Sequence, residues 1–297
     1  LLPLLHPGDR ALLPADGYGP TRALAAEHLT PRGVHVDLVA TQGLAHADLS
    51  GYDLVLVETP SNPGLRVADL ADVAARAHAN GRRDGAGALV VVDNTLLTPL
   101  GQRPLELGAD VVVASDTKAV NGHTDALGGH VASRDPQVMA RVRGWRTLAG
   151  GILGTHEAWL IHRGLETLEV RFARMCASAQ AVAELAAGHP AVRAVVYPGL
   201  ADHPDAEVVA RQMTAAGGLV GLRFADAAAA ERFIAAAQYV VPQTSFGGTH
   251  TAAERRARWG DDVPDGFVRL SVGVEPTAEL LADLERAMTA AGGGPTA

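Results

Sequence analysis

Asp110-Val-Val-Val-Ala-Ser-Asp-Thr-Lys118 joins an unbroken apolar run to a polar cluster that ends in a lysine. Two further runs have the same form, Asp53-Leu-Val-Leu-Val57 and Ala88-Leu-Val-Val-Val92. Unbroken runs of this kind are typical of strands in a parallel sheet that helices cover on both faces. Residues 67–80, between two of the runs, place apolar or small side chains at helical spacing and predict a crossover helix. The sequence therefore predicts a doubly wound α/β fold.

The remaining periodic segments extend this pattern in both directions. Upstream, residues 12–13 and 34–39 predict strands, and residues 21–29 predict a helix between them. Downstream, a long helix is expected over residues 165–187, with an apolar stripe that includes Leu165, Phe172 and Val182. Two strands and two helices should then form a smaller α+β region, over residues 219–224, 227–237, 267–272 and 277–290. We therefore expect a large domain over residues 1–165 and a small C-terminal domain over residues 166–297.

The composition argues against several classes of function. A net charge of −8 argues against a nucleic-acid surface, and Arg255-Arg256 is expected to be solvated surface. No apolar run approaches the ~20 residues that cross a bilayer, so no membrane association is expected. Cys176 is the only cysteine, which favours a reducing compartment, and we expect the cytoplasm. Because the chain starts at Leu1 without an initiator methionine, we expect that an N-terminal part of the large domain is missing from it.

A polar cluster follows each of the three buried runs. The clusters are Glu58-Thr-Pro-Ser-Asn62, Asp93-Asn-Thr95 and Ser115-Asp-Thr-Lys118. Any one of them could consist only of turn-forming residues. In an open α/β sheet, however, ligands bind at the carboxyl ends of the strands, where these clusters would meet. Lys118 is also the only lysine among 25 lysine and arginine residues, and a lysine, unlike an arginine, can lose its proton when it is desolvated.

The side chains at this edge match the requirements of pyridoxal 5′-phosphate (PLP). Lys118 would carry the cofactor as a Schiff base, and Asp93 would keep the pyridine nitrogen protonated. Ser115 and Thr117 would donate to the phosphate, Asn62 would pair with the ring hydroxyl, and Tyr18 would stack on the ring. Thr95 is a further cofactor-binding candidate, with a hydroxyl at the same edge. No dinucleotide or P-loop glycine motif is present, and no metal site is expected.

With its neighbouring segments, the quoted stretch resembles the signature of the cystathionine γ-synthase/γ-lyase family of Cys/Met metabolism. The resemblance is carried by Val90-Val-Val-Asp-Asn-Thr95, Gln102-Arg-Pro-Leu-Glu-Leu-Gly-Ala-Asp110 and Ser115-Asp-Thr-Lys-Ala-Val-Asn-Gly-His-Thr-Asp125. Matching segments continue from about residue 4 to residue 288. The resemblance implies the aspartate-aminotransferase-like fold (fold-type I), with a mostly parallel sheet in the large domain and a smaller α+β C-terminal domain.

The resemblance also implies roles for individual residues. Tyr18 corresponds to a tyrosine that stacks on the PLP ring and assists proton movements, so it is expected to be catalytic together with Lys118 and Asp93. Arg269 and Ser245 correspond to residues that bind the substrate carboxylate, and we expect Asn62 to contribute there as well. Members of the family usually form homotetramers, built as dimers of dimers with shared active sites, and their substrates are amino acids, bound as small molecules.

Within the family, the sequence is most similar to cystathionine γ-lyases, which convert L-cystathionine to cysteine, 2-oxobutanoate and ammonia. Asn121-Gly-His123 after the lysine favours a lyase, whereas Thr244 replaces an acidic residue of some cystathionine γ-lyases. The main alternative is γ-replacement, by a cystathionine γ-synthase or a homoserine-ester sulfhydrylase. Methionine γ-lyase is less favoured because Pro20 stands where those enzymes typically carry a cysteine. A catalytically silent PLP-binding paralogue and a nucleotide binder are the alternatives from other classes.

Overall fold

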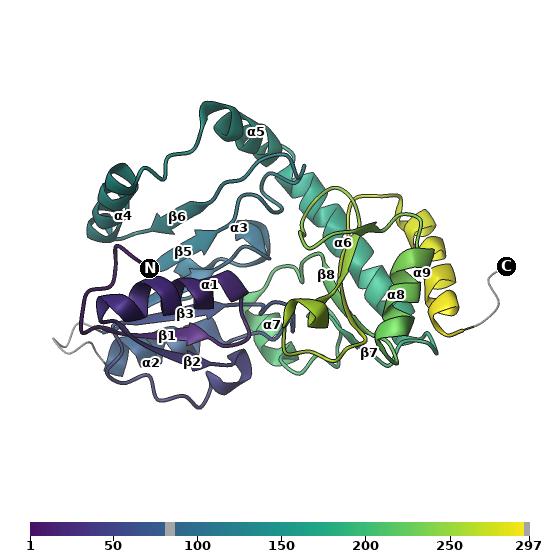
Figure 1. Cartoon of the computed structure of the whole chain (residues 1–297), viewed down its shortest axis with the longest axis horizontal. Coiled ribbons are helices and arrows are strands. Elements are labelled where there is room, and N and C mark those ends of the chain that lie inside the picture. The colour runs from purple at the N-terminus through teal and green to yellow at the C-terminus, as the bar shows by residue number, and fades with distance from the viewer. Residues whose placement is uncertain (81–86, 294–297) are drawn as a thin grey trace.

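The structure, a computed structural model, describes residues 1–80 and 87–293. Its first sheet has the strand order β2-β1-β3-β4-β5-β6 (Figure 1). The strands are β1 (Arg10–Pro14), β2 (His35–Val39), β3 (Leu54–Glu58), β4 (Leu89–Asp93), β5 (Val111–Ala114) and β6 (His130–Ser133). The first five pair in parallel, and β6 pairs antiparallel to β5. The three quoted runs therefore form adjacent parallel strands, and the predicted sheet is confirmed.

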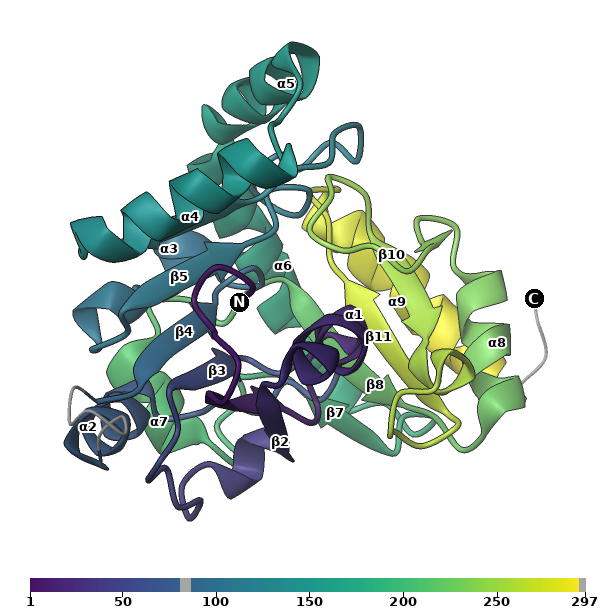
Figure 2. The ribbon, with the colours of Figure 1, turned by 60° about the vertical axis from the view of Figure 1, so that its left-hand side comes forward.

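Alternate residues of the central strands are buried on opposite faces of this sheet, which explains why the runs are apolar throughout. Val55 and Val57 of β3 belong to a core with α2 (Leu70–Asn80). Leu54 and Leu56 belong to another core with the π-helical segment Ala25–Leu29, which continues α1 (Gly19–Leu24), and with α4 (Pro136–Ala149). Figure 2 shows α2 and α4 on opposite sides of the strands. The doubly wound arrangement follows from burial on both faces.

A second sheet, with the order β7-β8-β11-β10-β9, forms the other half of the molecule. Its strands are β7 (Ala194–Val196), β8 (Leu219–Arg223), β9 (Val241–Pro242), β10 (Ala252–Arg255) and β11 (Phe267–Ser271). The helices α8 (Ala227–Ala236) and α9 (Thr277–Ala291) pack against it, with Phe233 and Leu284 in the same core as Leu222 and Leu270. The strands and helices predicted for this region are confirmed, whereas β7, β9 and β10 were not predicted.

The long helix predicted over residues 165–187 is wrong at its start. The helix α5 (Thr155–Leu165) ends at Leu165, and α6 (Leu168–Ala187) begins three residues later. Leu165 is 52% exposed instead of contributing to the apolar stripe, whereas Phe172 and Val182 are buried as predicted. At the end of α5, Gly164 lies against the backbone of Asn121, where a Cβ atom would meet the carbonyl oxygen at 2.3 Å. This tertiary contact places the end of α5 against the loop that follows β5.

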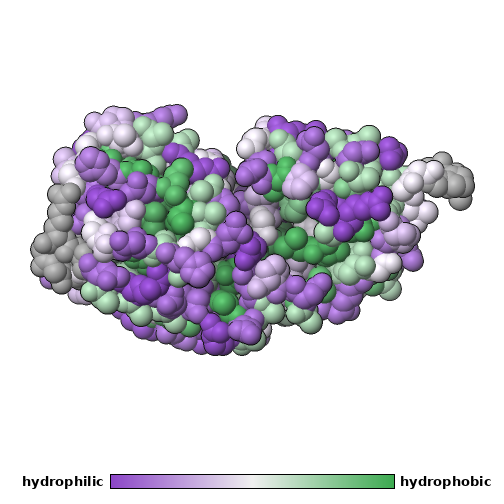
Figure 3. Space-filling model, turned by 90° about the horizontal axis from the view of Figure 1, so that it is seen from below, coloured by the Kyte–Doolittle hydropathy of each residue, from purple (hydrophilic) through white to green (hydrophobic). Residues whose placement is uncertain are grey.

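Two short helices connect the halves, α3 (Thr98–Gly101) and α7 (Ala206–Gln212). The N–H of Thr214, just after α7, donates to the carbonyl of Gly101 at 2.8 Å. All strands of the first sheet precede residue 165 and all strands of the second follow it, so the boundary near this residue stays a prediction that fits the sheets. Seen from below, the two lobes are separated by a notch (Figure 3). In the described part of the chain, no helix combines the length and apolar character needed to cross a membrane.

Candidate active site

Polar side chains from both halves of the molecule line one cavity of about 780 Å³. The carboxyl ends of β3, β4 and β5 contribute to its wall, as do β11 and residues 244–246. All the site residues predicted from the sequence line this cavity: Tyr18, Asn62, Asp93, Thr95, Ser115, Thr117, Lys118, Ser245 and Arg269. The cavity volume lies within the range of about 300–1,000 Å³ that is typical of small-molecule sites.

Lys118 lies in the turn after β5, where the N–H of Gly122 donates to its carbonyl at 2.8 Å. Its Nζ atom donates to Oγ of Ser245 at 3.1 Å and lies 5.0 Å from the ring centroid of Phe246. Burial lowers the pKa of Lys118, and the positive charge of Arg269 lowers it further. The lowered pKa increases the fraction of free amine, which is the form that attacks a carbonyl carbon.

Arg171 of α6, which the sequence analysis did not identify, holds the loop that carries the lysine. Its buried guanidinium donates to the carbonyls of Ala119 at 2.8 Å, Val120 at 3.2 Å and Gly164 at 2.6 Å. Gly122 packs against this group with φ +75°, and a Cβ atom there would lie 1.9 Å from a guanidinium nitrogen. The available sequence signal was an arginine inside the apolar stripe of a predicted helix, because a buried arginine needs several acceptors.

Asp93 ends β4 with its carboxylate at the cavity. Its Oδ1 atom accepts hydrogen bonds from the N–H of Thr95 at 2.9 Å and from Oγ1 of Thr95 at 2.5 Å. Burial raises the pKa of Asp93, although the two hydrogen bonds from Thr95 oppose this shift. Among the described residues, no ion pair involves this carboxylate. A buried carboxylate without a cationic partner fits the protonated ring nitrogen of PLP.

The predicted phosphate donors lie at the same edge of the sheet and differ in their hydrogen bonds. Oγ1 of Thr117 donates to the carbonyl of Gly128 at 3.2 Å and accepts from its N–H at 3.0 Å. The N–H of Ser115 donates to Oγ1 of Thr95 at 2.9 Å. Within residues 1–80 and 87–293, the Ser115 hydroxyl has no hydrogen-bond partner, so it is the more available donor for a phosphate.

Arg269 points from β11 to the cavity and is only 3% exposed. Its Nη1 atom donates to Oδ1 of Asn62 at 2.7 Å, and Nη2 donates to the carbonyl of Thr244. Burial lowers the pKa of Arg269 to about 10, and the charge of Arg256 also lowers it. Asn62, which we expected beside the cofactor ring hydroxyl, thus orients the arginine expected to bind substrate.

Glu58, quoted above only as a residue at a strand end, supports Tyr18. Its Oε2 atom accepts a hydrogen bond from the backbone N–H of Tyr18 at 2.6 Å, while the Tyr18 side chain is 54% exposed at the cavity. Gly17 makes this approach feasible, since a Cβ atom there would lie 2.7 Å from Oε2. Burial raises the pKa of Glu58 to about 8, with a further contribution from the charge of Asp93.

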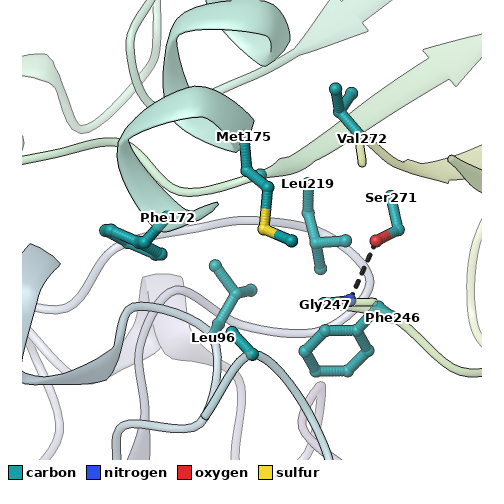
Figure 4. Close-up of a pocket in the computed structure, with 10 residues that line it drawn as sticks. Leu96, Phe172, Met175, Leu219, Phe246, Gly247, Ser271 and Val272 are labelled. Atoms are coloured by element: carbon teal, nitrogen blue, oxygen red, sulfur yellow. Dashed lines mark hydrogen bonds between the residues drawn. The ribbon is translucent and has the colours of Figure 1, made fainter. Parts of the chain in front are cut away.

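Apolar packing behind the cavity supports the loop that carries Ser245. A space of about 10 Å³, roughly the room that one water needs, lies among Phe172 and Met175 of α6 and Leu219 of β8 (Figure 4). Beside it, the N–H of Gly247 donates to Oγ of Ser271 at 3.0 Å. This apolar region therefore packs the two halves together and positions the loop that carries Ser245.

The cavity wall also includes residues that the sequence analysis missed: Arg256, Trp259 and Asp261. The side chain of Arg256 is only 15% exposed, so the expectation that it is solvated surface is wrong. Residues Arg256–Trp259 form a 3-10 turn, and Gly260 follows with φ 81°. This reversal brings the carboxylate of Asp261 to the guanidinium of Arg256, with both Nε and Nη2 at 2.6 Å from Oδ2.

Comparison with known proteins gives the family of this chain. The family model of Cys/Met metabolism PLP-dependent enzymes matches residues 1–289. A Streptomyces coelicolor protein, provisionally named a cystathionine gamma-lyase, is 48% identical over 286 residues, which cover 96% of this chain and 71% of that protein. The L-methionine gamma-lyase of Pseudomonas deceptionensis is 39% identical over 305 residues, which cover 97% and 75% of the two chains.

The fold is shared with solved enzymes. The structure of cystathionine gamma synthase from Xanthomonas oryzae pv. oryzae, in complex with aminoacrylate and cysteine, aligns with a TM-score of 0.91 at 34% identity. The alignment covers 100% of this chain and 78% of that one. These matches confirm the predicted fold-type I architecture and the predicted PLP cofactor. The chain belongs to the family of Cys/Met metabolism PLP-dependent enzymes, the lyases and synthases of sulfur amino-acid metabolism.

Proposed function

We propose that the chain catalyses γ-elimination of L-cystathionine, with water, to cysteine, 2-oxobutanoate and ammonia. The observation that carries the proposal is the placement of one amine, Lys118, in the same cavity as the buried Arg269 and the uncompensated carboxylate of Asp93. An amine, a carboxylate clamp and a carboxylate for the ring nitrogen are the groups that this reaction needs. The identity of 48% with the Streptomyces coelicolor protein favours γ-elimination within the family.

Arg269 would bind the α-carboxylate of the substrate. Asn62 and the carbonyl of Thr244 accept from Nη1 and Nη2 and hold the guanidinium in place. The remaining N–H groups of the fork can donate to a carboxylate in a charge-assisted pair. Burial strengthens this pair because little water competes for the same donors. The reacting end of the amino acid is thereby oriented towards Lys118.

The proton transfers fall to Lys118 and Tyr18. When bound, PLP accepts the electron pair that remains at Cα after its proton leaves, with Asp93 keeping the ring nitrogen protonated. Lys118, held by Ser245 and with its pKa lowered, takes the Cα proton as a free amine. As the sulfur leaves from Cγ, the Cα proton passes from Lys118 to the departing thiolate, directly or through Tyr18, and the thiolate becomes cysteine. The amine of Lys118 that is thereby freed takes the second proton, from Cβ.

The experiment is an assay of the purified, PLP-loaded protein with L-cystathionine. We expect release of 2-oxobutanoate, and we expect Lys118→Ala to abolish both turnover and the visible absorbance of bound cofactor. A matched assay with a homoserine ester and cysteine tests γ-replacement, which the likeness to the Xanthomonas synthase supports as the second candidate. Formation of cystathionine without 2-oxobutanoate would assign the chain to the synthases. If the protein turns over no sulfur amino acid, the result would favour the alternative of a catalytically silent PLP-binding paralogue.

We also propose that the protein acts as a cytoplasmic homotetramer, a dimer of dimers. Large apolar side chains are exposed on the helices α4, α5 and α6, which follow one another in the chain, and on the link between the first two: Leu148, Ile152, Trp159, Leu165 and Val170. Extensive exposed apolar surface usually marks an interface. Light scattering should give a tetramer for the wild type and a smaller species for Trp159→Glu combined with Leu165→Glu. A monomeric wild type would contradict the proposal.

A further inference from the structure

A second charged pair lies on the wall of the cavity that contains Lys118. The side chains of Arg256 and Asp261 are 15% and 13% exposed, and the guanidinium pairs with one carboxylate oxygen, Oδ2, to which Nε donates a hydrogen bond. The pair, Lys118 and Arg269 all line this cavity. The charges of Arg256 and Asp261 act on Arg269, lowering and raising its pKa respectively. The pair therefore belongs to the electrostatic environment of the reacting end.

The chemistry of the pair matches an amino-acid zwitterion. A guanidinium binds a carboxylate through several N–H donors, of which Arg256 uses the one on Nε for a hydrogen bond to Asp261. A carboxylate with two oxygens can accept from an ammonium while it keeps one bond to its arginine. The exposed ring of Trp259 lies on the same wall and offers an apolar surface to an uncharged stem. A thioether between two amino-acid ends has this combination of features.

We infer that Arg256 and Asp261 form a subsite for the distal amino-acid group of the substrate. Arg256 binds the distal carboxylate, Asp261 binds the distal ammonium, and Trp259 contacts the thioether stem. The inference rests on the proposed function because Lys118 and Arg269 must hold the other end. The subsite selects substrates with two zwitterionic ends over simple S-alkyl homocysteines. In a γ-replacement reaction, the same subsite would receive the amino-acid group of the incoming cysteine.

The test compares two substrates in three variants of the PLP-loaded protein. L-cystathionine carries the distal zwitterion, whereas S-ethyl-L-homocysteine has the same reacting end and no distal charge. We expect Arg256→Gln and Asp261→Asn to raise KM for cystathionine about 10- to 100-fold, which is the effect of losing a charged hydrogen bond. The constants for S-ethyl-L-homocysteine should stay within about twofold, since this substrate has no distal charged group for the pair to bind.

Arg255→Gln is the matched control. Arg255 is buried to a similar extent, with a side-chain exposure of 17%, and pairs with Glu231 at 2.8 Å, but it does not line the cavity. We expect this variant to leave KM for both substrates unchanged. An equal loss on both substrates in the Arg256 variant would overturn the inference, because the pair would then act on Arg269 or on the fold of the turn. An unchanged KM for cystathionine would overturn it as well.

A measurement of cystathionine binding distinguishes a failure of this inference from a failure of the proposed function. If the wild type releases no 2-oxobutanoate from cystathionine, the proposed function fails by itself. Calorimetric titration of the PLP-loaded protein with cystathionine then decides the inference. Binding that is about tenfold or more weaker in Arg256→Gln than in the wild type supports the subsite. Equal binding by the two proteins overturns it.

Discussion

Lys118 combines three properties that are seldom found together on a surface residue. It is partly buried, it experiences the positive charge of Arg269, and its amine donates to one hydroxyl, that of Ser245. The first two properties destabilise the ammonium form, and the third fixes the position of the nitrogen. The environment of the residue, more than the residue type, makes the amine suitable for imine formation.

Replacing Arg269 should weaken the binding of substrate. Arg269→Gln removes the charge and part of the fork, so KM for L-cystathionine should rise about 100-fold, with a smaller change in kcat. Steady-state kinetics of the PLP-loaded variant check this. Asn62→Ala should raise KM by a smaller factor, since it loosens the guanidinium without removing it. An unchanged KM in Arg269→Gln would remove this arginine from substrate binding.

Glu58 gives a pH-dependent prediction. Its pKa is raised from 4.5 to about 8, so the folded chain keeps a proton that the unfolded chain releases above pH 4.5. The free energy of unfolding therefore falls as pH rises from about 4.5 to about 8. Above that range the full loss of stability is present, because Glu58 is then ionised in the folded chain as well. Glu58→Gln should remove this loss of stability. The variant should be more stable than the wild type by a few kcal/mol at pH 8, the order of magnitude that corresponds to the shift in the pKa of Glu58, and by almost nothing near pH 4.5.

Urea denaturation of the wild type and Glu58→Gln at both pH values measures this difference. The same variant should retain the hydrogen bond from the Tyr18 N–H, because the amide oxygen replaces Oε2 as acceptor. A difference in stability that does not depend on pH would contradict a raised pKa for Glu58.

Among the elements, α6 anchors the loop that carries Lys118, in addition to the hydrogen bonds within the loop itself. The guanidinium of Arg171 replaces the water that would otherwise solvate the carbonyls of Ala119 and Val120, and it also reaches Gly164 at the end of α5. One side chain thereby ties three segments together. The position of Lys118 relative to the first sheet follows from this attachment.

Arg171→Leu should destabilise the protein by about 3 kcal/mol, because three carbonyls lose a charged donor and remain buried. Thermal unfolding measures the loss. Arg174→Leu is the matched control: Arg174 lies on the same helix and is exposed, and its replacement should change the stability by less than about 0.5 kcal/mol. Equal effects of the two changes would show that the hydrogen bonds of Arg171 contribute no net stability.

The elements that the sequence predicted most clearly are those whose burial is regular. The strands β3, β4 and β5 are apolar up to the carboxylates of Glu58 and Asp93 that end the first two, because both faces of the sheet are covered. By contrast, α4 buries only Val138, and β6 has no fully buried residue, so neither shows a clear hydrophobic period. The break between α5 and α6 was missed for another reason, namely that the contact of Gly164 with Asn121 is not visible in a local pattern.

At the scale of the whole molecule, Arg66 and Asp205 connect the two halves. Nε and Nη2 of Arg66 donate to the two carboxylate oxygens of Asp205 at 2.8 Å and 2.7 Å, and the N–H of Val67 adds a third bond at 2.8 Å. Burial alone would raise the pKa of Asp205, but these bonds and the charge of Arg66 lower it below its usual value. The carboxylate therefore stabilises the folded chain above pH 3.8, its ordinary pKa.

Asp205→Asn should cost about 2 kcal/mol of unfolding free energy at pH 7, and the difference should shrink as pH falls through the lowered pKa, where the wild-type carboxyl is also neutral. Chemical denaturation at pH 7 and at acid pH measures this. Asp202→Asn, an exposed position three residues earlier, should leave the stability unchanged at both pH values. A loss of equal size at the two pH values would mean that packing, not the charge, connects the halves.

The sequence by itself determined the sheet, the cofactor and the residues at the strand ends. Periodic burial and a single lysine are local properties, and strand order brings the ends of adjacent parallel strands to one edge. Only the tertiary structure decided which of these groups act on one another. Arg269 reaches Asn62 across 207 positions, and Arg171 reaches Ala119 across 52. Whether Arg256 is solvated or lines the cavity depended on the turn that places Asp261 beside it, because burial and pairing of a charge arise from the packing of the whole chain.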